Sequence, residues 1–286
     1  MEKLLEQIHR VEQRHLYELY RYMVKVFENT NLPSHDALHH LRVWLHCRGL
    51  IIELYKAGIE ISDELIENAI IACFFHDSGL TIDIGETHGK LGGQICRNYY
   101  NQHPNVTIKN IDIIVRAIEF HDDKSVKSGI VTKPEDMSGL NRLVSTADDL
   151  DAIGIIGIFR YVEIYLKRGI PDNELPQKVI KNLKDRFNNF TNAYSSLHRF
   201  SEKQKVRYLE TLNFFTELDS EMVRGHNASD SQFAIFKILK EQLIMQQQGI
   251  DKTIAYAINS TSASYPLHFF CKLKSELGVT STILIG

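Results

Sequence analysis

Apolar residues recur three and four positions apart along nearly the whole chain, a spacing typical of helices with one buried face. Proline is rare, glycine stands mostly at breaks in the pattern, and no segment shows the alternation expected of a strand. The pattern therefore predicts an all-α protein.

The breaks in the pattern predict where the helices begin and end. Ser62 is expected to begin one helix, because Asp63 and Glu64 then lie in the first turn, where acidic side chains are favourable. The apolar stretch over 141–168 is the longest. A polar run at 224–231 indicates a linker, and we predict a helical core over 1–225 and a C-terminal extension of about two helices over 226–286. The remaining helices are predicted over 3–29, 35–56, 62–79, 88–100, 108–122, 174–197 and 201–222, with a loop over 122–138.

Composition narrows the class of protein. The 286 residues, 43% hydrophobic and 24% charged, fit one large globular domain or two small ones. A formal net charge of -3 gives no general attraction to nucleic acid or to anionic membranes. The four cysteines form no C-x-x-C pair. The N-terminal residues lack the apolar core of a signal peptide, and no apolar run is long enough to cross a bilayer. We therefore expect a cytoplasmic protein that binds no membrane, and a homodimer stays open.

Histidine and aspartate are placed on the apolar faces of several helices. His-Asp dipeptides occur at 35–36, 76–77 and 121–122. Helical spacing places His39, His76, His121 and Asp148 in line with apolar neighbours, so these side chains are expected to point inward. A single inward histidine is usually a hydrogen-bonded core residue, but four inward polar groups on separate helices call for a common partner, because burial of such groups is costly. Imidazole and carboxylate ligands without thiolate suit Mn, Fe, Co, Ni, Zn or Mg.

Three segments carry a family resemblance. Residues 35–43, HDALHHLRV, resemble the opening H-D-x-x-H-x-x-R-V of the HD-domain metal-dependent phosphohydrolases, an all-helical superfamily. Residues 72–79, ACFFHDSG, resemble its A-x-x-x-H-D-x-G, and ADDLDAIG at 147–154 is similar to a motif of one bacterial branch. The resemblance covers roughly residues 20 to 170. Thr146 departs from it, since an acid commonly stands there.

The resemblance implies a metal site and its ligands. His39, His76, Asp77 and Asp148 would be the ligands of one divalent ion. His88 and His121 stand where two-metal relatives carry further ligands, with Asp77 bridging, so one or two ions per chain are expected. A loop position for His88 and a phosphate contact for His121 are the alternatives.

The resemblance also implies a reaction, the hydrolysis of a phosphate ester or anhydride by metal-activated water, with a nucleotide as the leading substrate. Asp77 would orient the nucleophile, and His35, His88 or His121 would protonate the leaving oxygen. His35 could equally cap the helix that follows it. Lys90, Lys124 and Arg42 are placed to meet phosphate oxygens, although the two lysines could instead be solvated and Arg42 could instead orient a carboxylate. Two other functions stay open, a metal-binding regulatory module without turnover and a diiron oxygenase.

Overall fold

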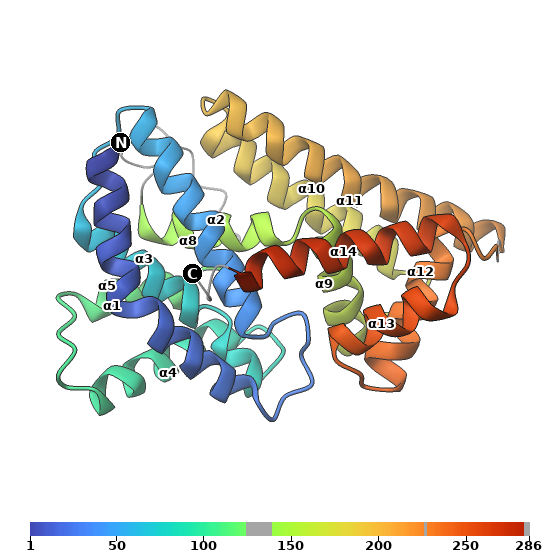
Figure 1. Cartoon of the computed structure of the whole chain (residues 1–286), viewed down its shortest axis with the longest axis horizontal. Coiled ribbons are helices and arrows are strands. Elements are labelled where there is room, and N and C mark those ends of the chain that lie inside the picture. The colour runs from blue at the N-terminus through green and yellow to red at the C-terminus, as the bar shows by residue number, and fades with distance from the viewer. Residues whose placement is uncertain (124–138, 226–227, 283–286) are drawn as a thin grey trace. The chain divides into compact units, whose positions relative to one another are not determined.

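The protein is all-α, as predicted. The computed structural model describes residues 1–123, 139–225 and 228–282, and every regular element in this part of the chain is a helix (Figure 1). These helices divide into two compact units. The first unit comprises Met1–Thr30, Asp36–Asp151 and Asn189–Ser201, and the second comprises Asn31–His35, Ala152–Asn188 and Glu202–Gly286. The boundary predicted near residue 225 falls inside the second unit, and the division into a core and an extension stays a prediction.

The first unit is built around one buried helix, α3. It packs against α1, α2, α5 and α8, and its residues from Asn68 to Phe75 are all buried. Side chains at its C-terminal end therefore emerge in the interior of the unit. The elements of the unit are α1 (Glu2–Phe27), α2 (Ala37–Lys56), α3 (Asp63–Phe75), the 3-10 helix η1 (Ser78–Thr81), α4 (His88–Gln102), α5 (Ile111–Glu119) and α8 (Leu140–Asp151).

Two N-terminal caps set where α2 and α3 begin. The Ser62 hydroxyl accepts a hydrogen bond from the backbone N–H of Leu65 at 3.1 Å, so the predicted start of α3 is confirmed. α2 begins at Ala37, because the Asp36 carboxylate accepts the backbone N–H of His39 at 3.1 Å. Asp36 thus caps α2, the role that the sequence left open for His35.

The longest apolar stretch of the sequence, 141–168, forms two helices. α8 ends at Asp151 and α9 (Ile155–Lys167) follows after a break at Gly154, whose φ is +83°. Glycine alone adopts this left-handed conformation without steric cost. The backbone N–H of Gly154 donates to the Thr211 hydroxyl at 2.7 Å, a bond that a continuous helix would not form.

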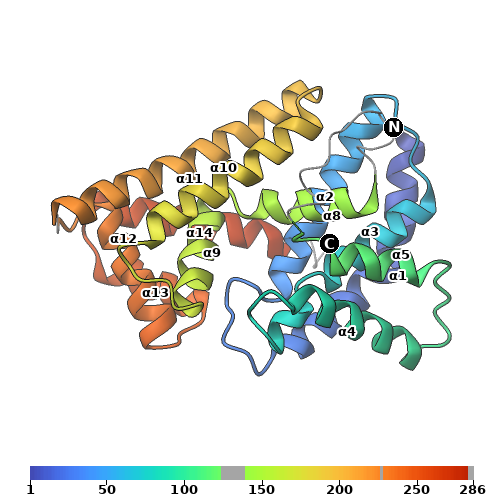
Figure 2. The same cartoon turned by 180° about the vertical axis from the view of Figure 1, so that it is seen from behind.

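The second unit contains α9 and the C-terminal helices (Figure 2). α9 packs against α12, α14 and a π-helix, η2. The predicted tail was expected to hold about two helices, but its described residues, 228–282, form three α-helices and η2. The elements are α10 (Leu175–Tyr194), α11 (His198–Arg224), α12 (Gln232–Leu239), η2 (Lys240–Met245), α13 (Ile250–Ser260) and α14 (Ser264–Thr282), with the adjoining ends of α10 and α11 assigned to the first unit.

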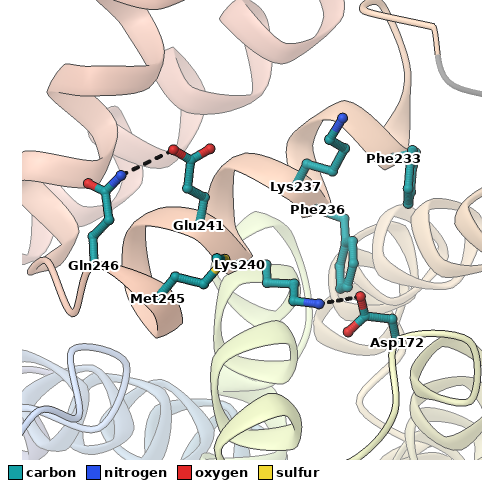
Figure 3. Close-up of a pocket in the computed structure, with 8 residues that line it drawn as sticks. All are labelled: Asp172, Phe233, Phe236, Lys237, Lys240, Glu241, Met245 and Gln246. Carbon is teal, nitrogen blue, oxygen red and sulfur yellow. Dashed lines mark hydrogen bonds and ion pairs between the residues drawn. The ribbon is translucent and has the colours of Figure 1, made fainter.

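A pocket of about 580 Å³ lies beside η2 in the second unit. Its lining mixes the rings of Phe233 and Phe236 with charged side chains, and Lys240 forms an ion pair with Asp172 (Figure 3). The other lining residues are Lys237, Glu241, Met245 and Gln246, so none of the predicted metal ligands belongs to this pocket.

In the described part of the chain, no helix has both the length and the apolar character needed to cross a bilayer.

Candidate metal centre

The predicted metal ligands come together in the first unit as two adjoining groups. Within each group, one possible ligand atom from every residue lies within 4.8 Å of the others, and all of these residues are buried. These buried histidines and aspartates could hold a metal ion. The first group is His39, His76, Asp77 and Asp148, and the second is Asp77, His88 and His121.

Helix ends bring these side chains to one place. His39 lies in the first turn of α2, His76 is the C-cap of the buried helix α3, and Asp77 follows it directly. His88 begins α4, and His121 comes just after the C-cap of α5. Because four of the five residues lie at or beyond a helix end, their positions depend on how the helices pack.

The first group has the spacing that one ion requires. The Nε2 atoms of His39 and His76 are 3.2 Å apart, and Asp77 Oδ2 lies 3.3 Å from each. Asp148 Oδ1 lies 3.8 Å from each of the same nitrogens. Two donors that bind one ion at about 2.1 Å are at most about 4.2 Å apart, so these four side chains fit a shared cation.

Asp77 belongs to both groups through different oxygens. Its Oδ2 faces His39 and His76, whereas its Oδ1 lies 3.2 Å from His121 Nε2 and 3.4 Å from His88 Nε2. One carboxylate therefore stands between two sets of imidazoles. This is the arrangement that a bridging ligand would need.

Hydrogen bonds at the far side of each ring direct the Nε2 atoms inward. The Nδ1–H groups of His76, His88 and His121 donate to main-chain carbonyls, those of Cys73 at 2.9 Å, Gly85 at 2.6 Å and Ile118 at 2.7 Å. His39 Nδ1–H donates to the carboxylate of Asp151 at 2.8 Å. A proton held on Nδ1 leaves the Nε2 lone pair of a neutral imidazole for a metal.

The charges of the first group are strongly coupled. Burial alone would raise the pKa of the Asp77 carboxyl, but the nearby imidazoles of His76, His121 and His39 hold this pKa well below its usual range. Burial alone would lower the pKa of His76, yet the carboxylates of Asp77 and Asp148 raise it to about 10. The site thus favours positive charge, and a divalent cation would take the place of the His76 proton, since imidazole binds metal in its neutral form.

His35 lies in the second unit and belongs to neither group. Arg160 Nη2 donates to His35 Nε2 at 3.3 Å, so the neutral ring carries its proton on Nδ1, which lies 2.7 Å from the Ser34 hydroxyl. Glu163 is 3.9 Å from Nδ1 and also accepts the backbone N–H of Ser34 at 2.9 Å. The segment before α2 is thereby tied to α9, and a catalytic role of His35 stays a prediction.

The other predicted contacts have different outcomes. Arg42 donates from Nε and Nη2 to Asp151 at 2.8 and 3.1 Å, so of its two proposed roles the structure supports the carboxylate contact. Lys90 is exposed on α4, and Lys124 lies outside the described residues. Thr146 is buried, and its side chain hydrogen-bonds the phenol of Tyr194.

Asp151 was not predicted as part of this site, although a signal for it was present. It follows Asp148 by three residues on α8, so both carboxylates lie on one helix face. Arg42 follows His39 by three residues on α2, the helix that packs against α8. The two spacings together point to a pairing between Arg42 and Asp151.

His40 is buried beside the centre, with its ring 5.2 Å from those of both His39 and His76. Burial and these two imidazoles lower the pKa of His40 well below 6.5, so the folded protein keeps this ring neutral. Below about pH 6.5 the unfolded chain binds a proton here that the folded chain does not, and stability falls as the pH drops.

We therefore expect the free energy of unfolding of the metal-free wild type to fall more steeply between pH 7 and pH 5 than that of His40→Leu. The difference in slope should approach about 1.4 kcal/mol per pH unit. Denaturant unfolding at several pH values measures it. His9→Leu, at an exposed position on α1, is the control and should keep the wild-type slope. Equal slopes in wild type and His40→Leu would contradict the assignment of a neutral buried ring.

Comparison of the chain with protein-family models, with curated proteins and with solved structures finds no significant match.

Proposed function

We propose that this chain is a metal-dependent phosphohydrolase of the HD-domain type that cleaves a phosphate ester or anhydride, most simply that of a nucleotide. The observation that carries the proposal is the convergence of His39, His76, Asp77 and Asp148 on one buried point. These are the residues of the H…HD…D pattern that the sequence shares with that superfamily.

The donor set supports a divalent ion held by nitrogen and oxygen ligands. His39, His76, Asp77 and Asp148 would hold the first ion, and Asp77 with His88 and His121 would hold a second. Mn, Fe, Co, Ni, Zn and Mg all suit such ligands. When bound, the metal supplies Lewis acidity and an activated water for attack on phosphorus.

The chain's own groups supply orientation and proton transfer. Asp77 would position both ions and accept a hydrogen bond from the attacking water. One of His35, His88 and His121 would protonate the leaving oxygen, and Lys124 would contact phosphate, as the sequence predicts. Because Arg42 is engaged by Asp151, neutralisation of the substrate's phosphate would fall mainly to the bound ions. A small anionic substrate is therefore favoured over a neutral ester.

A nucleotide panel tests this function. The full-length protein, loaded with Mn²⁺ or Co²⁺, is incubated with nucleoside mono-, di- and triphosphates and with phosphodiesters, and released phosphate and pyrophosphate are measured. We expect metal-dependent release that a chelator stops. His76→Ala, purified in parallel, should release no phosphate, because the first ion loses one of its four ligands. The Nε2 atom of this ligand lies 3.2 Å from that of His39.

Two outcomes would count against hydrolysis. Equal release by wild type and His76→Ala would assign the activity to a contaminant. Absence of release by wild type that holds its metal would favour the alternative, a metal-binding regulatory module without turnover.

A further inference from the structure

Asp151 connects an arginine to one of the candidate ligands inside the first unit. Its carboxylate is fully buried and accepts two hydrogen bonds from Arg42, at 2.8 and 3.1 Å. The oxygen that accepts the longer of these bonds also accepts the Nδ1–H of His39, at 2.8 Å. His46 Nε2 lies 3.7 Å from the other oxygen. His39, Arg42 and His46 lie on one face of α2, so Asp151 contacts this face at three positions.

This contact sets His39 apart from the other histidines of the centre. His76, His88 and His121 donate their Nδ1–H groups to neutral carbonyls, whereas His39 donates to an anion. A carboxylate behind an imidazole keeps the proton on Nδ1, fixes the plane of the ring, and makes Nε2 a stronger donor to a metal. The ring of His39 is therefore the one among these four histidines that a carboxylate orients through Nδ1.

Folding stability alone does not account for this buried pair. Removing two charges from water is costly, and a buried ion pair is often no more stabilising than apolar side chains of the same size. Arg42 compensates the charge of Asp151 with a two-pronged contact from Nε and Nη2. Arg42 therefore holds the Asp151 carboxylate at the position where it accepts the Nδ1–H of His39.

We infer that Asp151, clamped by Arg42, is a positioning residue that orients His39 and makes the four-residue group the tighter of two unequal ion sites. This inference rests on the proposed function, since it requires that the centre binds metal. The first group has two carboxylates and this third carboxylate behind His39, whereas the second group has only the shared Asp77 carboxylate besides its two imidazoles. The first ion should therefore bind the four-residue group, and the second should bind more weakly.

A matched control exists in the same unit. Glu67 is also held by an arginine, Arg14 at 2.7 Å, and also binds a buried histidine, His15 at 2.9 Å. Neither His15 nor Glu67 belongs to the ligand groups. Substitution of Glu67 therefore removes the same kind of carboxylate and histidine contact without touching a candidate ligand.

The experiment titrates full-length, metal-free protein with Mn²⁺ by calorimetry and records thermal unfolding without metal. Asp151→Ala should weaken binding of the first ion by about 100-fold, and Asp151→Asn, which keeps an acceptor oxygen but no charge, by about 10-fold. Glu67→Gln should leave the affinity unchanged although its unfolding temperature drops. Arg42→Lys, which keeps the charge but loses the two-pronged contact, should weaken the first ion less than Asp151→Ala. If Asp151→Ala does not fold, the affinity of Arg42→Lys for the first ion still tests the inference.

The outcomes separate the inference from the proposed function. Wild type without any bound Mn²⁺ would overturn both. Wild type that binds metal, with Asp151→Asn and Arg42→Lys of unchanged affinity, would overturn the positioning role of Asp151 alone. Equal loss of affinity in Glu67→Gln and Asp151→Asn would show that Asp151 affects metal binding only through the stability of the fold.

Discussion

Replacing Asp77 with alanine is expected to abolish metal binding at both groups at once. Its two oxygens face separate pairs of imidazoles at 3.2 to 3.4 Å, so this one substitution removes a ligand from each. The loss of affinity should exceed the roughly 100-fold that removal of a supporting residue costs. Element-resolved metal analysis of the purified variant, after equilibration with excess Mn²⁺ or Zn²⁺, measures the result.

His121→Ala is the natural comparison for Asp77→Ala. His121 Nε2 lies near Asp77 Oδ1 and belongs only to the second group, so the variant should bind one ion where the wild type binds two. Stoichiometric metal in Asp77→Ala would exclude this carboxylate as a ligand. A wild type that binds a single ion at saturation, with the same content in His121→Ala, would exclude the second site.

Gly79→Ala is expected to damage the fold and the second group together. A Cβ at Gly79 would lie 2.0 Å from the carbonyl oxygen of His88 and 2.7 Å from the backbone nitrogen of Gly92, so η1 rests directly on the backbone of α4. Backbone atoms cannot rotate away, and α4 would have to shift. We expect a loss of about 3 kcal/mol in the free energy of unfolding, at the upper end of the cost of overpacking. His88, the first residue of α4, would move with the helix, so the second ion should be lost as well.

Denaturant unfolding and metal analysis of Gly79→Ala measure both effects, and Gly49→Ala serves as the control. A Cβ at Gly49, inside α2, meets no atom within 4 Å, so this variant should be up to about 1 kcal/mol more stable, because alanine favours a helix. Wild-type stability and two bound ions in Gly79→Ala would show that η1 and α4 do not need this close approach.

Helix positions were predictable where local interactions decide them. The Ser62 hydroxyl caps α3 through a backbone N–H three residues away, and this bond needs no distant partner. The break at Gly154 was missed because the apolar pattern continues across it and because its hydrogen bond goes to Thr211, 57 residues later. A hydrophobic pattern reports which face is buried, and it does not report where a helix ends against another segment.

The inward direction of the candidate ligands was also predictable from the chain. His39, His76, His121 and Asp148 are all buried, as their positions on apolar helix faces indicated. The periodicity of each helix carries that information by itself, since it fixes which side chains share the buried face. It does not say which side chains of different helices meet.

The sequence by itself therefore determined the all-α class and the set of polar side chains that must be compensated in the interior. Only the tertiary structure decided that Asp77 faces two groups through its two oxygens, and that Arg42 is occupied by Asp151, 109 residues away. The physical reason is range. Helix formation and amphipathicity act over three or four residues, whereas ligand geometry and charge pairing depend on contacts between helices whose separation along the chain carries no periodic signal.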